Sequence, residues 1–262
     1  MSQDRRSFLK NAGCAAMGIG CGFPLLGVGC NRAEHGEGDS QTSQLAMIVD
    51  IEKCQDPKVQ EACTKACHQA HNVPEIKDKH HRIDWIKSEK RGHVFPDQTH
   101  AHADKTVKDM PVLVLCNHCD NPPCVKVCPT AATWKRDSDG VVMMDMHRCI
   151  GCRYCMAACP YGARSFNWSD PEFKETRKLA DYPRREKGVV EKCTFCEELI
   201  RRGETPACVE AAASVSGGEG ALVFGDLSDK QSEVSKILAD SSINTICRRV
   251  SLGTGPNVFY IV

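Results

Sequence analysis

Cysteine is the residue that most constrains this chain, because it fills 18 of the 262 positions and recurs at short, fixed spacings. The first tight run is Cys116-x2-Cys119-x4-Cys124-x3-Cys128, followed by Pro129. The second is Cys149-x2-Cys152-x2-Cys155-x3-Cys159, followed by Pro160. A third comprises Cys193-x2-Cys196 and Cys208, and an opening run reads Cys54-x8-Cys63-x3-Cys67. Runs of this kind indicate metal binding rather than a disulfide framework.

The second run has the spacing of bacterial ferredoxins, in which three thiolates hold one [4Fe–4S] cube and the fourth ligates the neighbouring cube. The following proline fixes φ and has no N–H, which suits a sharp exit from the ligand loop. Applied along the chain, this crossover rule predicts three complete cofactor sites. Their ligand sets are Cys67, Cys193, Cys196 and Cys208 (site A); Cys116, Cys119, Cys124 and Cys159 (site B); and Cys149, Cys152, Cys155 and Cys128 (site C).

A fourth ligand set is incomplete. Gln60 stands where a full opening run would have a cysteine, and Ala212 stands at the corresponding place in the closing run, followed by Ala213 instead of proline. The crossover rule assigns both losses to one cluster. We therefore predict three [4Fe–4S] clusters and one vacated site, site D, which consists of Cys54, Gln60, Cys63 and Ala212. Its cysteines are expected to be free or disulfide-bonded; an unconventional fourth cluster using Gln60 or His68 is the alternative.

Other chemistries fit the sequence less well. Cys-x2-Cys pairs also suit structural zinc, but two four-cysteine runs ending in Cys-Pro do not resemble zinc knuckles. Disulfides within such short runs would be strained for most pairings. No Cys-x2-Cys-His motif for haem attachment occurs. A net charge of zero gives no support for nucleic-acid binding, and no nucleophile–base pair, phosphate loop or substrate pocket motif is present. We predict an electron carrier without catalytic residues.

Short apolar segments precede the cysteine runs, at 45–51, 111–115, 140–145 and 188–190. This repetition predicts an α+β fold of two tandem ferredoxin-like modules, rich in loops. Residues 111–170 would form the central module, and 45–74 with 188–227 the outer module. An inserted loop would span 75–110, and an extended tail 228–262, with a helix at 228–239, would close a sheet or dock on a partner. His100, His102 and Asp104 in the insertion are expected to be solvated rather than metal-binding.

Aromatic side chains near the runs are expected to keep water from the clusters or simply to pack in the core. These are Tyr154, Tyr161, Phe166 and Trp168.

The first 31 residues have the layout of a twin-arginine export signal, with Arg5 and Arg6 ahead of an uncharged segment rich in Gly and Ala. A polar linker follows at 32–44. Cys14, Cys21 and Cys30 fall in the signal and are not expected to be cluster ligands. The signal predicts a periplasmic location, and cleavage, lipidation at Cys30 or retention as an anchor all stay open.

With these motifs in view, the chain resembles the four-cluster, ferredoxin-like iron–sulfur subunits that accompany membrane proteins of the NrfD/PsrC type. Within that family it is most similar to DsrO-type periplasmic subunits of the sulfite-reduction-associated DsrMKJOP complex. The resemblance rests on the motifs at 67–74, 116–124, 147–162, 191–196 and 222–227. It covers nearly everything from Leu45 onward, and it departs from the family pattern at Gln60, Ala212 and Ala213.

The resemblance implies a relay of single electrons between a quinone-interacting membrane subunit and another redox subunit, such as a multihaem cytochrome c. The alternative is the iron–sulfur subunit of a molybdopterin oxidoreductase, of the polysulfide, thiosulfate or dimethyl sulfoxide reductase type. A third interpretation, from a different class, is an exported cysteine-rich binding protein without iron.

Overall fold

The computed structural model describes residues 42–100, 102–170, 182 and 185–262. The twin-arginine segment, most of the linker and Cys14, Cys21 and Cys30 lie outside this part of the chain. Among the described helices, none combines the length and apolar character needed to cross a membrane.

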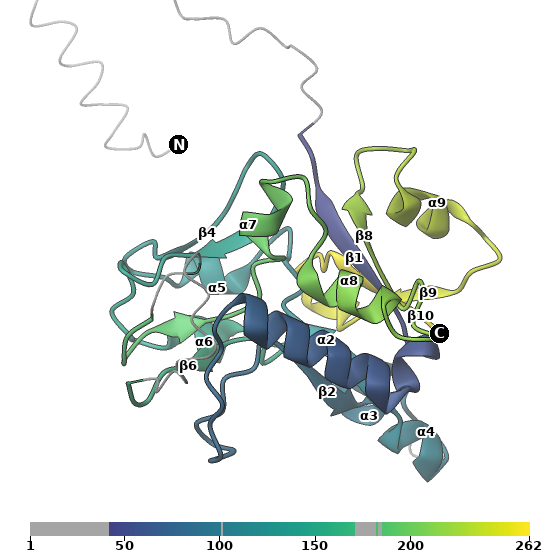
Figure 1. Cartoon of the computed structure of the whole chain (residues 1–262), viewed down its shortest axis with the longest axis horizontal. Helices are drawn as coiled ribbons and strands as arrows, with labels where there is room; N and C mark the ends of the chain where they lie inside the picture. Colours follow the sequence, from purple (N-terminus) through teal and green to yellow (C-terminus); the bar gives the residue numbers. More distant parts are fainter. Residues whose placement is uncertain (1–41, 101, 171–181, 183–184) are drawn as a thin grey trace, which may run out of the picture. The chain divides into compact units, whose positions relative to one another are not determined.

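The largest sheet has four strands in the order β8-β1-β10-β9 (Figure 1). Its strands are β1 (Leu45–Asp50), β8 (Leu222–Asp226), β9 (Thr245–Cys247) and β10 (Val258–Ile261). Strand β1 is antiparallel to β8 and parallel to β10, with Met47 opposite both Phe224 and Val258. The C-terminal tail therefore closes a sheet, which is one of the two roles that its sequence left open.

The two faces of this sheet bury different layers, because side chains alternate along each strand. Ala46 and Ile48 face helix α9 (Glu233–Ala239) and contact its Val234. Met47 and Val49 face the main core on the other side. Helix α9 begins later than the sequence predicts, because Ser232 caps it by accepting a hydrogen bond from the Ser235 backbone N–H.

Helix α2 (Pro57–Ala70) packs against α8 (Ala207–Ala213) (Figure 1). It carries two cysteines of the opening run, Cys63 and Cys67. It starts at Pro57, directly after Asp56, whose side chain accepts a hydrogen bond from the Lys58 N–H. Its buried face consists of Val59, Cys63 and Cys67, four residues apart. Before it, the short 3-10 helix η1 (Lys53–Gln55) buries Cys54.

The segment 75–110 is more than the inserted loop that the sequence predicted. Strand β2 (Ile86–Lys90) pairs antiparallel with β3 (Pro111–Leu115), and Ile83, Trp85 and Phe95 are buried in the main core. The remaining elements of this segment are α3 (Arg91–Val94), η2 (Pro96–Gln98) and α4 (Lys105–Asp109). Although the segment carries many charges, its buried apolar side chains fix its position against the core.

The central module consists of short elements joined by cysteine-bearing loops. Apart from β3, its strands lie in two antiparallel pairs. In one, β4 (Thr133–Lys135) pairs with β5 (Val142–Met144); in the other, β6 (Ser165–Phe166) pairs with β7 (Val190–Glu191), which belongs to the outer module. The sequence Asp137-Ser138-Asp139-Gly140 is typical of a turn, and a turn joins β4 to β5 there, with Gly140 supplying its positive φ. Helices α5 (Pro123–Lys126) and α6 (Tyr154–Ala158) pack on each other. The remaining short elements are α7 (Glu197–Ile200) and η4 (Val250–Leu252).

A buried polar cluster joins the insertion to the rest of the core. The Glu191 carboxylate forms an ion pair with Arg185, with 2.9 Å between the Nε and Oε2 atoms, and both side chains are at most 1% exposed. The same carboxylate accepts hydrogen bonds from Trp85 Nε1 at 2.7 Å and from Asn167 Nδ2 at 2.5 Å. Arg185 also donates to the backbone carbonyls of His71 and Asn72. The side chains of Arg185, Trp85 and Asn167 therefore all interact with the Glu191 carboxylate.

Candidate cofactor sites

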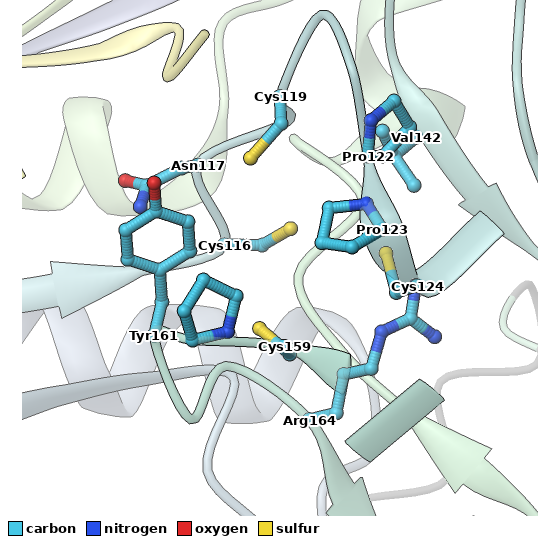
Figure 2. A pocket seen from close by; sticks show the side chains of 11 residues that line it. Cys116, Asn117, Cys119, Pro122, Pro123, Cys124, Val142, Cys159, Tyr161 and Arg164 are labelled. Carbon is cyan, nitrogen blue, oxygen red and sulfur yellow. The ribbon is translucent and has the colours of Figure 1, made fainter. Parts of the chain in front are cut away.

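Site B is a pocket into which four sulfur atoms point (Figure 2). Three of its cysteines, Cys116, Cys119 and Cys124, come from the first run, and Cys159 comes from the end of the second. Three prolines, Tyr161 and other side chains complete the lining. The structure thus brings together all four residues that the crossover rule assigns to this site.

Burial and repulsion from neighbouring thiols raise the pKa of two of these cysteines, Cys119 and Cys159. Burial, followed by repulsion from Cys116, raises the pKa of the Cys119 thiol to about 12. Burial is also the main cause of the raised pKa of Cys159. A group of thiolates in such a pocket requires positive charge at its centre.

Site A has the same character but comes from three helices and a loop. Cys67 lies in the last turn of α2, Cys193 follows β7, Cys196 caps α7, and Cys208 lies in the first turn of α8. Burial, then repulsion from Cys193, Cys196 and Cys208, raises the pKa of Cys67, so the four thiols lie within electrostatic reach of one another. All four are at most 7% exposed. The Phe195 N–H donates a hydrogen bond to the Cys193 sulfur at 3.4 Å.

Site C lies closer to the surface. Burial is the main cause of the raised pKa of Cys155, and repulsion from Cys149 contributes to it. Cys128 follows α5, which packs on the helix that carries Cys155. Burial raises the pKa of Cys128, but hydrogen bonds from the backbone of Thr133 and its neighbours outweigh that effect and lower the pKa. For Cys152, which is partly exposed, only its place in the run locates it at this site.

Pairs of thiols from different sites link the three sites into a row. Repulsion from Cys116 of site B raises the pKa of Cys193 of site A, with burial as the larger cause. In the same way Cys124 of site B acts on Cys155 of site C. Site B therefore lies between sites A and C.

Two buried cations that the sequence did not reveal lie between neighbouring sites. The Arg164 guanidinium donates a hydrogen bond to Thr133 Oγ1 at 2.9 Å and lies beside Cys124 (Figure 2). Burial would lower the pKa of Arg164, but Cys124, Cys155 and Cys116 raise it. Lys192 is 1% exposed and donates to the carbonyls of Val142 and Cys193. Both cations are placed to offset negative charge at the sulfur sites.

These donor sets fit [4Fe–4S] clusters. Each of sites A and B gathers four cysteine sulfurs, the ligand set of such a cluster, in a buried setting with N–H donors or cations nearby. Within the described residues, no group of three or more His, Cys, Asp and Glu is arranged to hold a single metal ion. Among these residues, His100, His102 and Asp104 form no such group.

The cysteines of site D pack in the main hydrophobic core. Cys54 and Cys63 are fully buried free thiols, and they donate to the carbonyls of Ala221 and Cys208 at 3.5 and 3.4 Å. Burial raises the pKa of each to about 12. The Gln60 amide donates to the Cys54 carbonyl at 2.5 Å, and Ala212 is buried in the same apolar cluster. His68 and Gln60 instead line a surface pocket on the other side of α2.

The aromatic side chains divide into two groups. Tyr161 is buried against site B, where its hydroxyl pairs with Thr254 at 2.5 Å, and Phe166 packs beside Cys149 and Cys155. Tyr154 and Trp168 are 62% and 40% exposed, so these two do not pack in the core. Two further aromatic rings, those of Phe195 and His118, are buried and stack with 3.7 Å between ring centroids. The sequence did not reveal this pair.

A row of buried four-cysteine sites on short ferredoxin-like elements defines a multi-cluster iron–sulfur protein. Comparison with known proteins agrees with this class. Two family models, both described as a 4Fe-4S dicluster domain, match residues 108–178 and 148–233. The chain thus contains [4Fe–4S]-binding domains.

Several characterised relatives extend over most of the chain. The "Hdr-like menaquinol oxidoreductase iron-sulfur subunit 1" of Archaeoglobus fulgidus is 41% identical over 98% of this chain and 97% of its own length. The iron–sulfur subunit of a putative dimethyl sulfoxide reductase of Halobacterium salinarum is 39% identical over 84% of this chain and 79% of its own. The "Menaquinone reductase, iron-sulfur cluster-binding subunit" of Nitratidesulfovibrio vulgaris is 33% identical over 82% and 87%. The chain belongs to this family of iron–sulfur electron-transfer subunits of oxidoreductase complexes.

Proposed function

We propose that this protein relays single electrons along the row A–B–C through three [4Fe–4S] clusters. The observation that supports this most directly is that thiols of neighbouring sites lie within electrostatic reach of each other, Cys193 with Cys116 and Cys155 with Cys124. When bound, the clusters supply one-electron oxidation and reduction. The proposed ligands are the twelve cysteines of sites A, B and C.

The chain's own residues hold the clusters and set their surroundings. Thiolates from separate segments fix each site in place, and buried neighbours such as Tyr161 exclude water from site B. The Phe195 N–H and the Arg164 guanidinium place positive charge near the sulfurs, which favours the more negatively charged, reduced state of a bound cluster. The protein thereby adjusts the potentials without taking part in bond chemistry.

We further propose a DsrO-type role, with electrons exchanged between an NrfD/PsrC-type quinone-interacting membrane subunit and a multihaem cytochrome c. The relatives named for menaquinol oxidation and menaquinone reduction support a quinone-linked complex. The Arg5-Arg6 signal supports a periplasmic location. The alternative of a molybdopterin oxidoreductase subunit draws its support from the dimethyl sulfoxide reductase relative. Co-purification from the native host distinguishes them by recovering a cytochrome or a large molybdopterin subunit.

Iron analysis tests the number of clusters. We expect about twelve irons per chain after anaerobic purification, because site D has lost two ligands. The variant Cys54→Ala/Cys63→Ala should keep all of this iron, since its two thiols only pack in the core. Cys67→Ala is the matched comparison on the same helix and should lose about four irons. About sixteen irons in the wild type, or iron loss in the double variant, would contradict a vacated site.

Replacing Arg164 tests the electrostatic role of the buried cation. Arg164→Gln removes a positive charge beside Cys124 and Cys155, so the midpoint potentials of the clusters at sites B and C should fall by roughly tens of millivolts. Redox titration followed by electron paramagnetic resonance measures the change. Arg201→Gln, at an exposed arginine on the surface, is the control and should leave the potentials unchanged. Equal potentials in both variants would show that Arg164 is only a packing residue.

A further inference from the structure

The surface over site C differs from the surroundings of the other sites because it is open. Cys128, Cys149 and Cys152 are partly exposed, whereas the four cysteines of site A are buried. Electron transfer to a partner requires a redox centre close to the surface. Site C is therefore the end of the row where an outside partner can approach.

Three apolar side chains stand exposed on the segments that hold site C. Ile150 is 65% exposed and lies between two of the site's cysteines in sequence, and Tyr154 is 62% exposed at the start of α6. Val127, 37% exposed, directly precedes Cys128 at the end of α5, the helix that packs on α6. Large apolar side chains in this position suit the dry centre of a small docking surface.

The charged side chains on the same segments are all basic. Lys126, Arg148 and Arg153 are exposed, and the Arg153 guanidinium lies 4.9 Å from the Trp168 ring centroid. The stretches 121–136 and 146–168 contain no Asp or Glu. Asp145 lies just outside them, and its carboxylate accepts the backbone N–H groups of His147 and Arg148. A chain with zero net charge thus presents a basic face at its most accessible cluster site.

We propose that the face formed by Lys126, Val127, Arg148, Ile150, Arg153 and Tyr154 docks an electron-transfer protein whose own redox centre is rimmed by Asp and Glu. This inference rests on the proposed electron relay. Opposite charges steer the two proteins together and orient them, and the apolar centre brings the redox groups close. Weak, fast complexes of this kind need only a small contact area.

Oxidation of the reduced full-length protein by small oxidants of opposite charge tests this proposal. The anaerobically purified protein is reduced with dithionite, freed of excess reductant, and mixed with substoichiometric ferricyanide, an anion, or hexaammineruthenium(III), a cation. The return of the visible cluster absorbance is followed by stopped flow. The variant Lys126→Glu/Arg148→Glu/Arg153→Glu reverses the charge of this face. Lys58→Glu/Lys65→Glu/Lys230→Glu makes the same change in net charge at exposed lysines elsewhere and serves as the control.

At low ionic strength, the face variant should react with ferricyanide about tenfold more slowly than the wild type and faster than the wild type with the cation. The control variant should change either rate far less, and added salt should reduce the contrast. If both triple variants respond alike, the basic face is not where electrons leave the protein. Iron content separates the two hypotheses: a wild type without iron overturns the relay itself, whereas iron-replete variants with equal rates overturn only the docking face.

Discussion

Replacing Cys159 is expected to empty site B, although this residue belongs to the cysteine run that supplies site C. Cys159 lines the same pocket as Cys116, Cys119 and Cys124, so its removal leaves that cluster with three protein ligands (Figure 2). Cys159→Ala should therefore lose about four of the roughly twelve irons per chain. It should also stop electron passage between sites A and C, because site B lies between them.

Double variants make this prediction specific. Cys159→Ala/Cys124→Ala should lose no more iron than either single variant, since both changes affect one cluster, whereas Cys159→Ala/Cys155→Ala should lose about eight irons. Iron and acid-labile sulfide analysis measures both. Cys247→Ala, at a half-buried cysteine outside the runs, is the control and should keep its iron. The reverse pattern in the two double variants would mean that each run binds its own cluster without crossover.

Removing the Glu191 carboxylate is expected to be among the most destabilising single changes outside the cluster ligands. Arg185 is buried beside it, and Trp85 and Asn167 direct their N–H groups at the same two oxygens. Glu191→Ala removes the carboxylate that pairs with a buried arginine and that accepts hydrogen bonds from two buried donors, which costs about 3–5 kcal/mol. For a chain of this size, that corresponds to a fall in melting temperature on the order of 10 °C.

Anaerobic thermal unfolding at one fixed scan rate measures the effect, because a protein with bound clusters unfolds irreversibly. Glu204→Ala is the matched control, since Glu204 pairs with Arg202 where both side chains are about half exposed. That change should alter stability by less than about 1 kcal/mol. Glu191→Gln, which keeps one acceptor oxygen, should fall between the two. If Glu191→Ala and Glu204→Ala have the same melting temperature, the buried ion pair contributes no more to stability than a surface ion pair.

Local features of the fold were predictable where a few neighbouring residues decide the outcome. The strands that lead into the cysteine runs, at Leu45–Asp50, Pro111–Leu115 and Val142–Met144, form as expected because each is a short apolar segment. The turn with Gly140 also forms where the sequence places it. Helix α2 was missed because its cysteines were interpreted only as ligands. The four-residue spacing of Val59, Cys63 and Cys67 was the signal that could have revealed it.

Distant contacts escaped prediction. The insertion was interpreted from its charges, yet its buried Ile83, Trp85 and Phe95 fix it in the core. Arg164 and Lys192 are buried, although charged residues are normally found at the surface, and only their neighbours across the fold explain this. The exposure of Tyr154 and Trp168 likewise depends on what packs over them.

The sequence by itself determined the chemistry of this protein, because the spacing of thiols along a short loop decides which inorganic group they can hold. The tertiary structure alone decided that sites A, B and C lie in a row, that Cys54, Cys63 and Ala212 are buried in the main core, and that site C is partly exposed. The physical reason is that ligand spacing is a property of adjacent residues. Order, burial and exposure depend on contacts such as that between α2 and α8, which join residues far apart in the chain.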